Sequence, residues 1–375
     1  MSLYCIVIGG NIVHMSLHDA VREGNFGLVR MLLQKGANPN ERNKNKTTPL
    51  YLACLEGWDH IVRLLLDHGA DMEAAQKFGS KPLHAACERS LNVARLLLEK
   101  GANVEAKDSE GRSPLQIACK NGRLEVMQLL LDHNADIESK CSEMKTALHW
   151  ACRRDNLEFV QLLLDCGANI NAKDDNEGTP LHFACENGRL KIIRLLLDRG
   201  AEINAQDKNG YTGMHLTASM NYCNSTQLLI DRGGDVNAKG GATGWTPLHL
   251  SCKFARYQAA RMLINSGASV NSRGKQQMTP LHLACAYGHV ELARLLLDRK
   301  ADVEAKTTLN WTALHLACRS GRLEAASLLL QRSASLDAKT NEDELTPLHM
   351  ACQYDQLEVV WTLMQYSPLQ FFKSS

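Results

Sequence analysis

The sequence predicts an all-α protein, a solenoid in which helix-turn-helix units stack one after another and short β-hairpin-like fingers connect them. The motif that begins at Thr279 recurs about every 33 residues, and each copy contains two short helical patterns. A fixed period of this size is typical of repeat arrays, in which each unit packs only on its neighbours. The eleven related segments start near residues 15, 48, 81, 113, 146, 179, 212, 246, 279, 312 and 346.

The first helix of each unit is indicated by its start and by its apolar spacing. Thr279 suits an N-cap, and Pro280 suits the first helical position, where a missing N-H costs nothing. Leu281, Ala284 and Cys285 then fall at i, i+3 and i+4. This spacing predicts a narrow apolar stripe of small residues, which lets a neighbouring helix approach closely.

A second helix is expected over residues 290–298, because leucines recur at helical spacing there. A Gly-Ala pair usually follows this helix, and glycine can adopt the left-handed conformation that ends a helix. These capping glycines are Gly36, Gly69, Gly101, Gly167, Gly200 and Gly267. A short extended piece and a polar tip then lead into the next Thr-Pro, which predicts the finger.

This arrangement, with the pattern Thr-Pro-Leu-His-x-Ala, resembles the ankyrin repeat family. The histidine of the pattern recurs at His18, His84, His149, His182, His215, His249, His282, His315 and His349. The resemblance covers residues 15–366 and leaves an N-terminal arm, 1–14, and a C-terminal tail, 367–375. It implies a curved solenoid whose fingers and first helices line a concave face.

Composition argues against several partner classes. Lys and Arg total 42 and Asp and Glu total 41, so we expect neither nucleic-acid binding nor attraction to an acidic membrane. No apolar run reaches transmembrane length, so direct membrane insertion is not expected. Residues 1–8 lack the basic flank and cleavage site of a signal peptide.

The cysteines follow the repeat. Nine occupy one equivalent position, expected to be buried beside the small alanine: Cys54, Cys87, Cys119, Cys152, Cys185, Cys252, Cys285, Cys318 and Cys352. Equivalent positions one layer apart are too distant for disulfides. Free thiols indicate a reducing compartment, so we expect a cytoplasmic or nuclear location.

Catalytic, cofactor and metal sites are not expected. His and Cys at i and i+3, as in His282 and Cys285, imitate metal-ligand spacing, but their recurrence favours a structural role in each layer. The glycine-rich stretch 239–245 lacks the Lys-Ser/Thr pair that would hold phosphate. No carboxylate pair or Ser/His/Asp set stands outside the repeat pattern, so we expect a protein that is not an enzyme.

The resemblance also implies where partners bind: at the finger positions before the Thr and at the two positions after the Ala-Cys pair. Residues of the later repeats there are mostly aromatic or apolar: Tyr211, Trp245, Phe254, Met278, Tyr287, Trp311, Leu345 and Tyr354. Residues of the middle repeats are basic: Arg112, Lys120, Arg153 and Arg154. Tyr, Trp and Arg are frequent binding hot spots, so this surface suits an extended peptide with apolar anchors and an acidic segment. Alternatively, Trp245 and Trp311 only shield the base of the next finger.

Two further expectations concern single positions. By resemblance to finger asparagines that are hydroxylated in other ankyrin proteins, Asn204 and Asn237 are candidates for hydroxylation. The seventh repeat departs most from the pattern, with Gly213 in place of proline and a polar Thr217 in the packing stripe, and is expected to be the softest layer.

The expected function is that of a non-enzymatic scaffold or adaptor for one or more intracellular proteins. The alternative is the ankyrin substrate-recognition region of a larger effector, such as a ubiquitin-ligase receptor, a channel or a kinase. The apolar stretch 361–372 keeps this alternative open, because either the tail folds back over it, or it contacts a partner, or the native chain continues.

Overall fold

The computed structural model describes residues 4–8 and 11–371, with side chains over 15–366. The chain divides into two compact units, unit 1 (Met1–Asp175) and unit 2 (Asn176–Ser375), each described by itself. Both units consist of stacked helix pairs, so the predicted all-α fold class is confirmed. A short antiparallel hairpin at the N-terminus adds two strands, β1 (Tyr4–Ile8) and β2 (Asn11–Met15), with Tyr4 opposite Met15.

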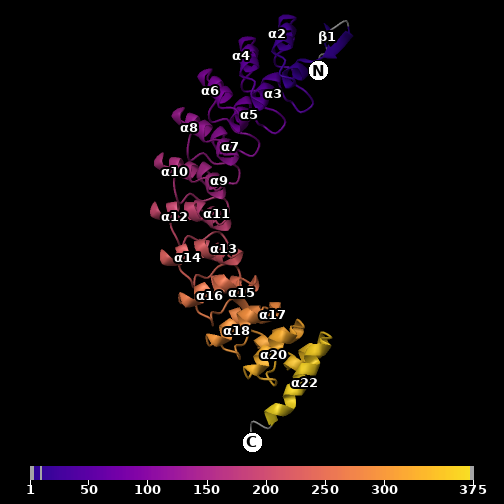
Figure 1. Ribbon diagram of the computed structural model, residues 1–375, viewed down its shortest axis with the longest axis vertical. Coiled ribbons are helices and arrows are strands. Elements are labelled where there is room, and N and C mark those ends of the chain that lie inside the picture. Colours follow the sequence, from indigo (N-terminus) through magenta and orange to yellow (C-terminus); the bar gives the residue numbers. More distant parts are fainter. Residues whose placement is uncertain (1–3, 9–10, 372–375) are drawn as a thin grey trace. The chain divides into compact units, whose positions relative to one another are not determined.

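Unit 1 contains five helix pairs. Its first helices are α1 (Leu17–Arg22), α3 (Pro49–Glu56), α5 (Pro82–Arg89), α7 (Pro114–Asn121) and α9 (Ala147–Arg153). Its second helices are α2 (Phe26–Gln34), α4 (Asp59–Asp67), α6 (Leu91–Glu99), α8 (Leu124–Asp132) and α10 (Leu157–Asp165). Each first helix packs on the next first helix, and the second helices form a parallel row beside them (Figure 1).

Unit 2 repeats this arrangement with six pairs. Its first helices are α11 (Pro180–Glu186), α13 (Gly213–Met220), α15 (Pro247–Lys253), α17 (Pro280–Tyr287), α19 (Ala313–Arg319) and α21 (Pro347–Gln353). Its second helices are α12 (Leu190–Asp198), α14 (Cys223–Asp231), α16 (Tyr257–Asn265), α18 (Val290–Asp298), α20 (Leu323–Gln331) and α22 (Leu357–Phe371). One finger contains a single 3-10 turn, η1 (Lys275–Gln277).

In most layers the motif histidine joins its own helix to the following finger. The Nδ1 atom of His282 accepts from the backbone N-H of Thr279 at 3.1 Å. Its Nε2 lies 3.1 Å from the carbonyl oxygen of Trp311, in the next layer. Because Nδ1 accepts, Nε2 carries the proton and donates to that carbonyl. This ring therefore ties one layer to the next.

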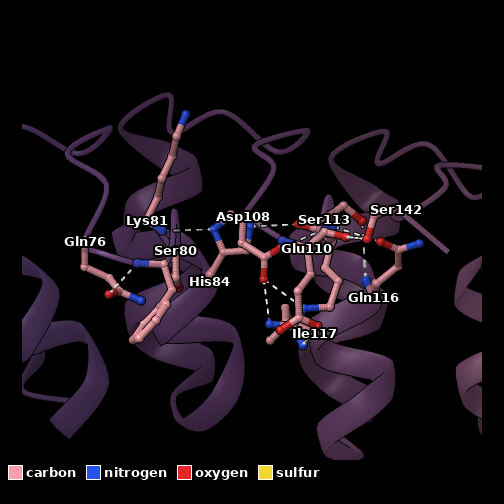
Figure 2. A network of polar contacts seen from close by, with 12 residues as sticks. Gln76, Ser80, Lys81, His84, Asp108, Glu110, Ser113, Gln116, Ile117 and Ser142 are labelled. Atoms are coloured by element: carbon pink, nitrogen blue, oxygen red, sulfur yellow. Dashed lines mark hydrogen bonds and ion pairs between the residues drawn. The ribbon is translucent and has the colours of Figure 1, made fainter.

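Unit 1 shows how glutamine replaces this histidine. The Oε1 atom of Gln116 accepts from the N-H of Ser113 at 2.9 Å, and its Nε2 donates to the carbonyl oxygen of Lys145 at 2.6 Å. The preceding layer keeps the imidazole, and Figure 2 shows His84 and Gln116 in successive layers. His84 Nε2 lies 3.1 Å from the carbonyl of Arg112. A side-chain amide thus makes the same two bonds without an ionisable ring.

The helix ends follow the expected chemistry. The capping glycines have positive φ angles, for example 91° at Gly267, as predicted. Asn134 takes the same role in repeat 4 with a φ of 59°. Asparagine tolerates this region better than most residues, which explains why the substitution leaves the helix end intact.

The equivalent cysteines are buried except one. Cys54, Cys119 and Cys285 are each at most 1% exposed, as predicted, whereas Cys352 is exposed. The expectation was wrong at Cys352 because α21 packs on a first helix, α19, on one side only within the described residues. Burial raises the pKa of the Cys285 and Cys318 thiols to about 12.

This difference predicts the pattern of thiol reactivity. Iodoacetamide at pH 7.5 is expected to alkylate Cys166 and Cys352, which are exposed, and to leave Cys285 and Cys318 unmodified until the chain unfolds. Peptide mass spectrometry before and after addition of urea measures both groups in one sample. Rapid native alkylation of Cys285 would contradict the burial of this position.

Candidate functional site

The predicted aromatic row, defined as Tyr211, Trp245, Phe254, Met278, Tyr287, Trp311, Leu345 and Tyr354, lies in unit 2. Its members lie either at the ends of first helices or in the fingers, and the two groups differ in exposure. Those at the ends of first helices are exposed: Phe254 by 44%, Tyr287 by 45% and Tyr354 by 40%. Those in the fingers are half-buried. Both groups leave part of their side chains accessible to another molecule.

The finger members are fixed through their backbones. The carbonyl oxygens of Tyr211, Trp245 and Leu345 accept from the histidine of the preceding layer at 3.0 to 3.1 Å. Met278 and Trp311 make the same bond at 3.1 Å. The side chains of the row therefore start from backbone positions set by the repeat itself, which limits the conformational entropy that binding would cost.

Trp245 packs against neighbouring residues of the fold and is also partly exposed at the surface. Its ring stacks on His249 with the centroids 6.5 Å apart and the planes 3° from parallel. A Cβ atom added at Gly274, in the next finger, would lie 2.6 Å from Trp245 Cδ1. The indole thus shields the base of the next finger, in keeping with the alternative interpretation of this residue. Its half-exposed part remains available to a partner.

Cations lie over several of these rings. Lys253 Nζ is 5.0 Å from the Trp245 centroid and 5.1 Å from that of Phe254. The guanidinium carbon of Arg319 is 5.1 Å from the centroids of both Trp311 and Tyr354. These cation-π contacts hold long side chains against the rings. The sequence alone did not place Lys253 or Arg319 in contact with them.

The basic residues of unit 1 are partly neutralised. Arg112 makes ion pairs with Asp108 at 2.8 Å and with Glu110 at 2.7 Å. Lys120 Nζ lies 5.7 Å from the ring centroid of Trp150. Arg153 and Arg154 are exposed near the end of α9. An acidic partner would therefore meet Arg112 already paired, which weakens the charge of this group.

Trp150 was missed by the sequence analysis. Its half-buried ring has the ammonium groups of Lys120 and Lys145 over it, at 5.7 and 5.5 Å. Its Nε1 atom is buried and makes no hydrogen bond to any described residue. The signal that could have identified it is a tryptophan directly after the motif histidine, where the other motif histidines from His84 onward are followed by alanine, phenylalanine, leucine or methionine.

The two asparagines proposed for hydroxylation bridge neighbouring layers. Asn204 Oδ1 accepts from the N-H of Asp235 at 2.8 Å, and Asn237 Oδ1 accepts from that of Ser269 at 2.8 Å. Glutamates at equivalent positions make the same bond, as between Glu105 and the N-H of Asp136 at 2.8 Å. Layer bridging explains these residues, both of which are also exposed. Their hydroxylation stays a prediction.

The C-terminal helix carries an exposed apolar strip. Leu357 is 74% exposed, Trp361 69% and Met364 60%. One of the alternatives was that the tail with Phe371 and Phe372 folds back over this end, but these side chains lie outside the described residues. The strip is the most exposed group of large apolar side chains that a single described helix carries.

The described residues contain neither a membrane-spanning helix nor a group of metal ligands. No helix within 4–8 and 11–371 is both long enough and apolar enough to cross a bilayer. Over the same residues, no three or more His, Cys, Asp or Glu side chains are grouped as they would be to hold a metal ion.

Comparisons with known proteins agree with this geometry. A family profile described as ankyrin repeats (3 copies) matches residues 17–108, 105–174, 171–240, 214–307 and 300–370. The crystal structure of the human ASB11 ankyrin repeat domain is similar, with a TM-score of 0.54, 30% identity, and coverage of 59% of this chain and 99% of that one.

A curated relative matches over a shorter stretch. Protein phosphatase 1 regulatory subunit 27 of Mus musculus is 40% identical over 43 residues, which cover 12% of this chain and 28% of that protein. The chain therefore spans little more than a quarter of the length of that relative. The repeated helix pairs and the matched profile together show that this chain belongs to the ankyrin repeat family, whose members are generally protein–protein interaction modules and typically not enzymes.

Proposed function

We propose that this chain is a non-enzymatic scaffold or adaptor that binds intracellular proteins through the face formed by its fingers and first helices. The observation that carries the proposal is the aromatic row, whose exposed members recur at the ends of α15, α17 and α21. Exposed aromatic side chains at equivalent positions of three layers suit an extended partner with apolar anchors. The name of the mouse relative, a regulatory subunit, also supports protein partners.

The free thiols support the proposed compartment. The free cysteines include many that are buried, such as Cys54, Cys87 and Cys185, and none of the described ones forms a disulfide. This usage supports a reducing cytoplasmic or nuclear location.

The test compares a pair of exposed aromatic residues with one aromatic residue of nearly equal exposure outside the row. Phe254→Ala combined with Tyr287→Ala is expected to reduce the retention of specific partners about tenfold or more, because each ring is a candidate hot spot. The control is Phe26→Ala, on the second helix α2, whose ring is exposed by 43%. Quantitative mass spectrometry of proteins retained from a cell lysate measures both, and thermal melting verifies folding. Equal retention by all three proteins would contradict the proposal.

A second candidate function rests on α22. Its exposed Leu357, Trp361 and Met364 favour docking against further protein, as the substrate-recognition region of a larger effector would. Trp361→Ser with Met364→Ser is then expected to release a co-purifying effector while binding through the aromatic row persists. Unchanged co-purification would argue against this role.

A further inference from the structure

A pocket of about 160 Å³ opens in unit 2 between two neighbouring fingers, which precede α19 and α21. Trp311, Leu345 and Met350 supply much of its apolar lining, and Glu342 and Asp343 supply carboxylates. A cavity of about 150 Å³ holds a molecule the size of benzene. The pocket therefore has room for one side chain.

The charged side chains that line this pocket are all acidic. Glu342 and Asp343 are the charged groups of the lining, and both are exposed to solvent. Neither is ion-paired or hydrogen-bonded to any residue that the structure describes, since the ion pair on this finger joins Lys339 to Glu344 at 2.8 Å. The lining thus carries two carboxylates that form no ion pair with any described residue.

Arg319 limits how the aromatic rings can be used. Its guanidinium lies over both Trp311 and Tyr354 at 5.1 Å but does not line the pocket. An incoming cation would therefore be held mainly by the carboxylates, while its apolar stem packs on Leu345 and Met350. Arginine has such a stem and a planar head that pairs with carboxylates in a bidentate manner.

We propose that this pocket receives an arginine side chain from an extended segment of a partner protein. Its methylene groups pack on Trp311, Leu345 and Met350, and its guanidinium pairs with Glu342 and Asp343. The inference rests on the proposed scaffold function and adds to it the chemistry of one anchor. It also distinguishes this pocket from the basic residues of unit 1, which suit an acidic segment.

The experiment selects peptides on the full chain from a phage-displayed library of random 12-residue sequences. Enriched peptides are expected to share one arginine, and replacing it by citrulline, which is neutral and nearly the same shape, should weaken binding at least tenfold. Glu342→Gln with Asp343→Asn should weaken the parent peptide by a similar factor. The control, Asp337→Asn with Asp355→Asn, removes the same charge from exposed positions outside the lining and should bind normally.

The outcomes separate this inference from the proposed function. Peptides that need Phe254 and Tyr287 but neither an arginine nor the two carboxylates would overturn the pocket assignment and leave the scaffold function standing. Equal binding of a lysine-substituted peptide would contradict the choice of arginine. A selection that enriches no peptide would count against both. Thermal melting of each variant shows that the loss is one of binding, because all four altered carboxylates are exposed.

Discussion

Lowering the pH from 7 to 5 is expected to destabilise the protein strongly, because several layer-bridging histidines are held neutral. Burial lowers the pKa of His215, His249 and His282 from the model-compound value of 6.5 to about 4, despite their bonds to backbone carbonyls. Burial also lowers the pKa of His84 and His315. Before one of these rings can bind a proton, its buried hydrogen bonds must break or its layer must open to solvent.

The sign follows from linkage between protonation and folding. In the unfolded chain these rings bind protons below about pH 6.5, whereas in the folded chain they bind protons only near pH 4. Their contribution to the free energy of unfolding is therefore fully present above pH 6.5 and is lost as the pH falls toward 4. One pKa unit corresponds to about 1.4 kcal/mol, so each ring costs about 2 kcal/mol at pH 5. Urea unfolding followed by circular dichroism at pH 7, 6 and 5 measures the loss.

Glutamine provides the matched control. Gln116 shows that a side-chain amide makes both bonds of the motif histidine. The variant His215→Gln with His249→Gln and His282→Gln should therefore fold and lose much less stability between pH 7 and pH 5. If this variant and the wild type lose the same free energy of unfolding, the histidines are not the cause.

The sequence alone was sufficient to predict the fold because the same motif recurs along the chain. Equivalents of Thr279, Pro280 and His282 occur in most layers, so one weak local signal becomes strong by repetition. The same reasoning gave the capping glycines and most of the buried cysteines. It failed at Cys352 because burial depends on a neighbouring layer, which a motif within one repeat does not report.

The candidate site was less accessible to sequence reasoning. The pattern located Trp311 and Tyr354 but not Arg319 between them, since a cation-π contact depends on which way a long side chain turns. The pocket was missed for a related reason. In the sequence, Glu342 and Asp343 belong to a polar finger tip like any other. Only the structure shows that they line one pocket together with Met350 of the next helix.

The seventh layer shows that departures from the motif can be compensated locally. Thr217 is fully buried, but its hydroxyl donates to the carbonyl oxygen of Met214 at 3.3 Å. Thr226 donates similarly to the carbonyl of Tyr222 at 3.1 Å. Since buried polar groups cost most when they lack a partner, these bonds reduce the penalty that the sequence suggested. The softness of this layer remains a prediction for hydrogen exchange.

Replacing Leu296 by alanine is expected to cost about 3 kcal/mol of stability and to loosen only the layers around it. Leu296 is 0% exposed in α18, and removing a buried leucine side chain leaves a cavity that the surroundings fill only in part. Leu297, the next residue of the same helix, is half-buried. Leu297→Ala is therefore the matched control and should cost about 1 kcal/mol or less.

The helices in which Leu296→Ala speeds hydrogen exchange show whether each layer, and the part of the binding face that it carries, is stabilised by its neighbours. Each layer of a repeat array is stabilised by its immediate neighbours, so Leu296→Ala should speed amide hydrogen exchange in α15 to α20 first. Tyr287 and Trp311, which lie in or beside these helices, should then lose their fixed positions, and a partner bound there should dissociate faster. Exchange in α3 to α8 of unit 1 should not change. Uniform acceleration along the whole chain, or equal losses for the two leucine variants, would show that the molecule unfolds as one cooperative body and that its binding face is not assembled layer by layer.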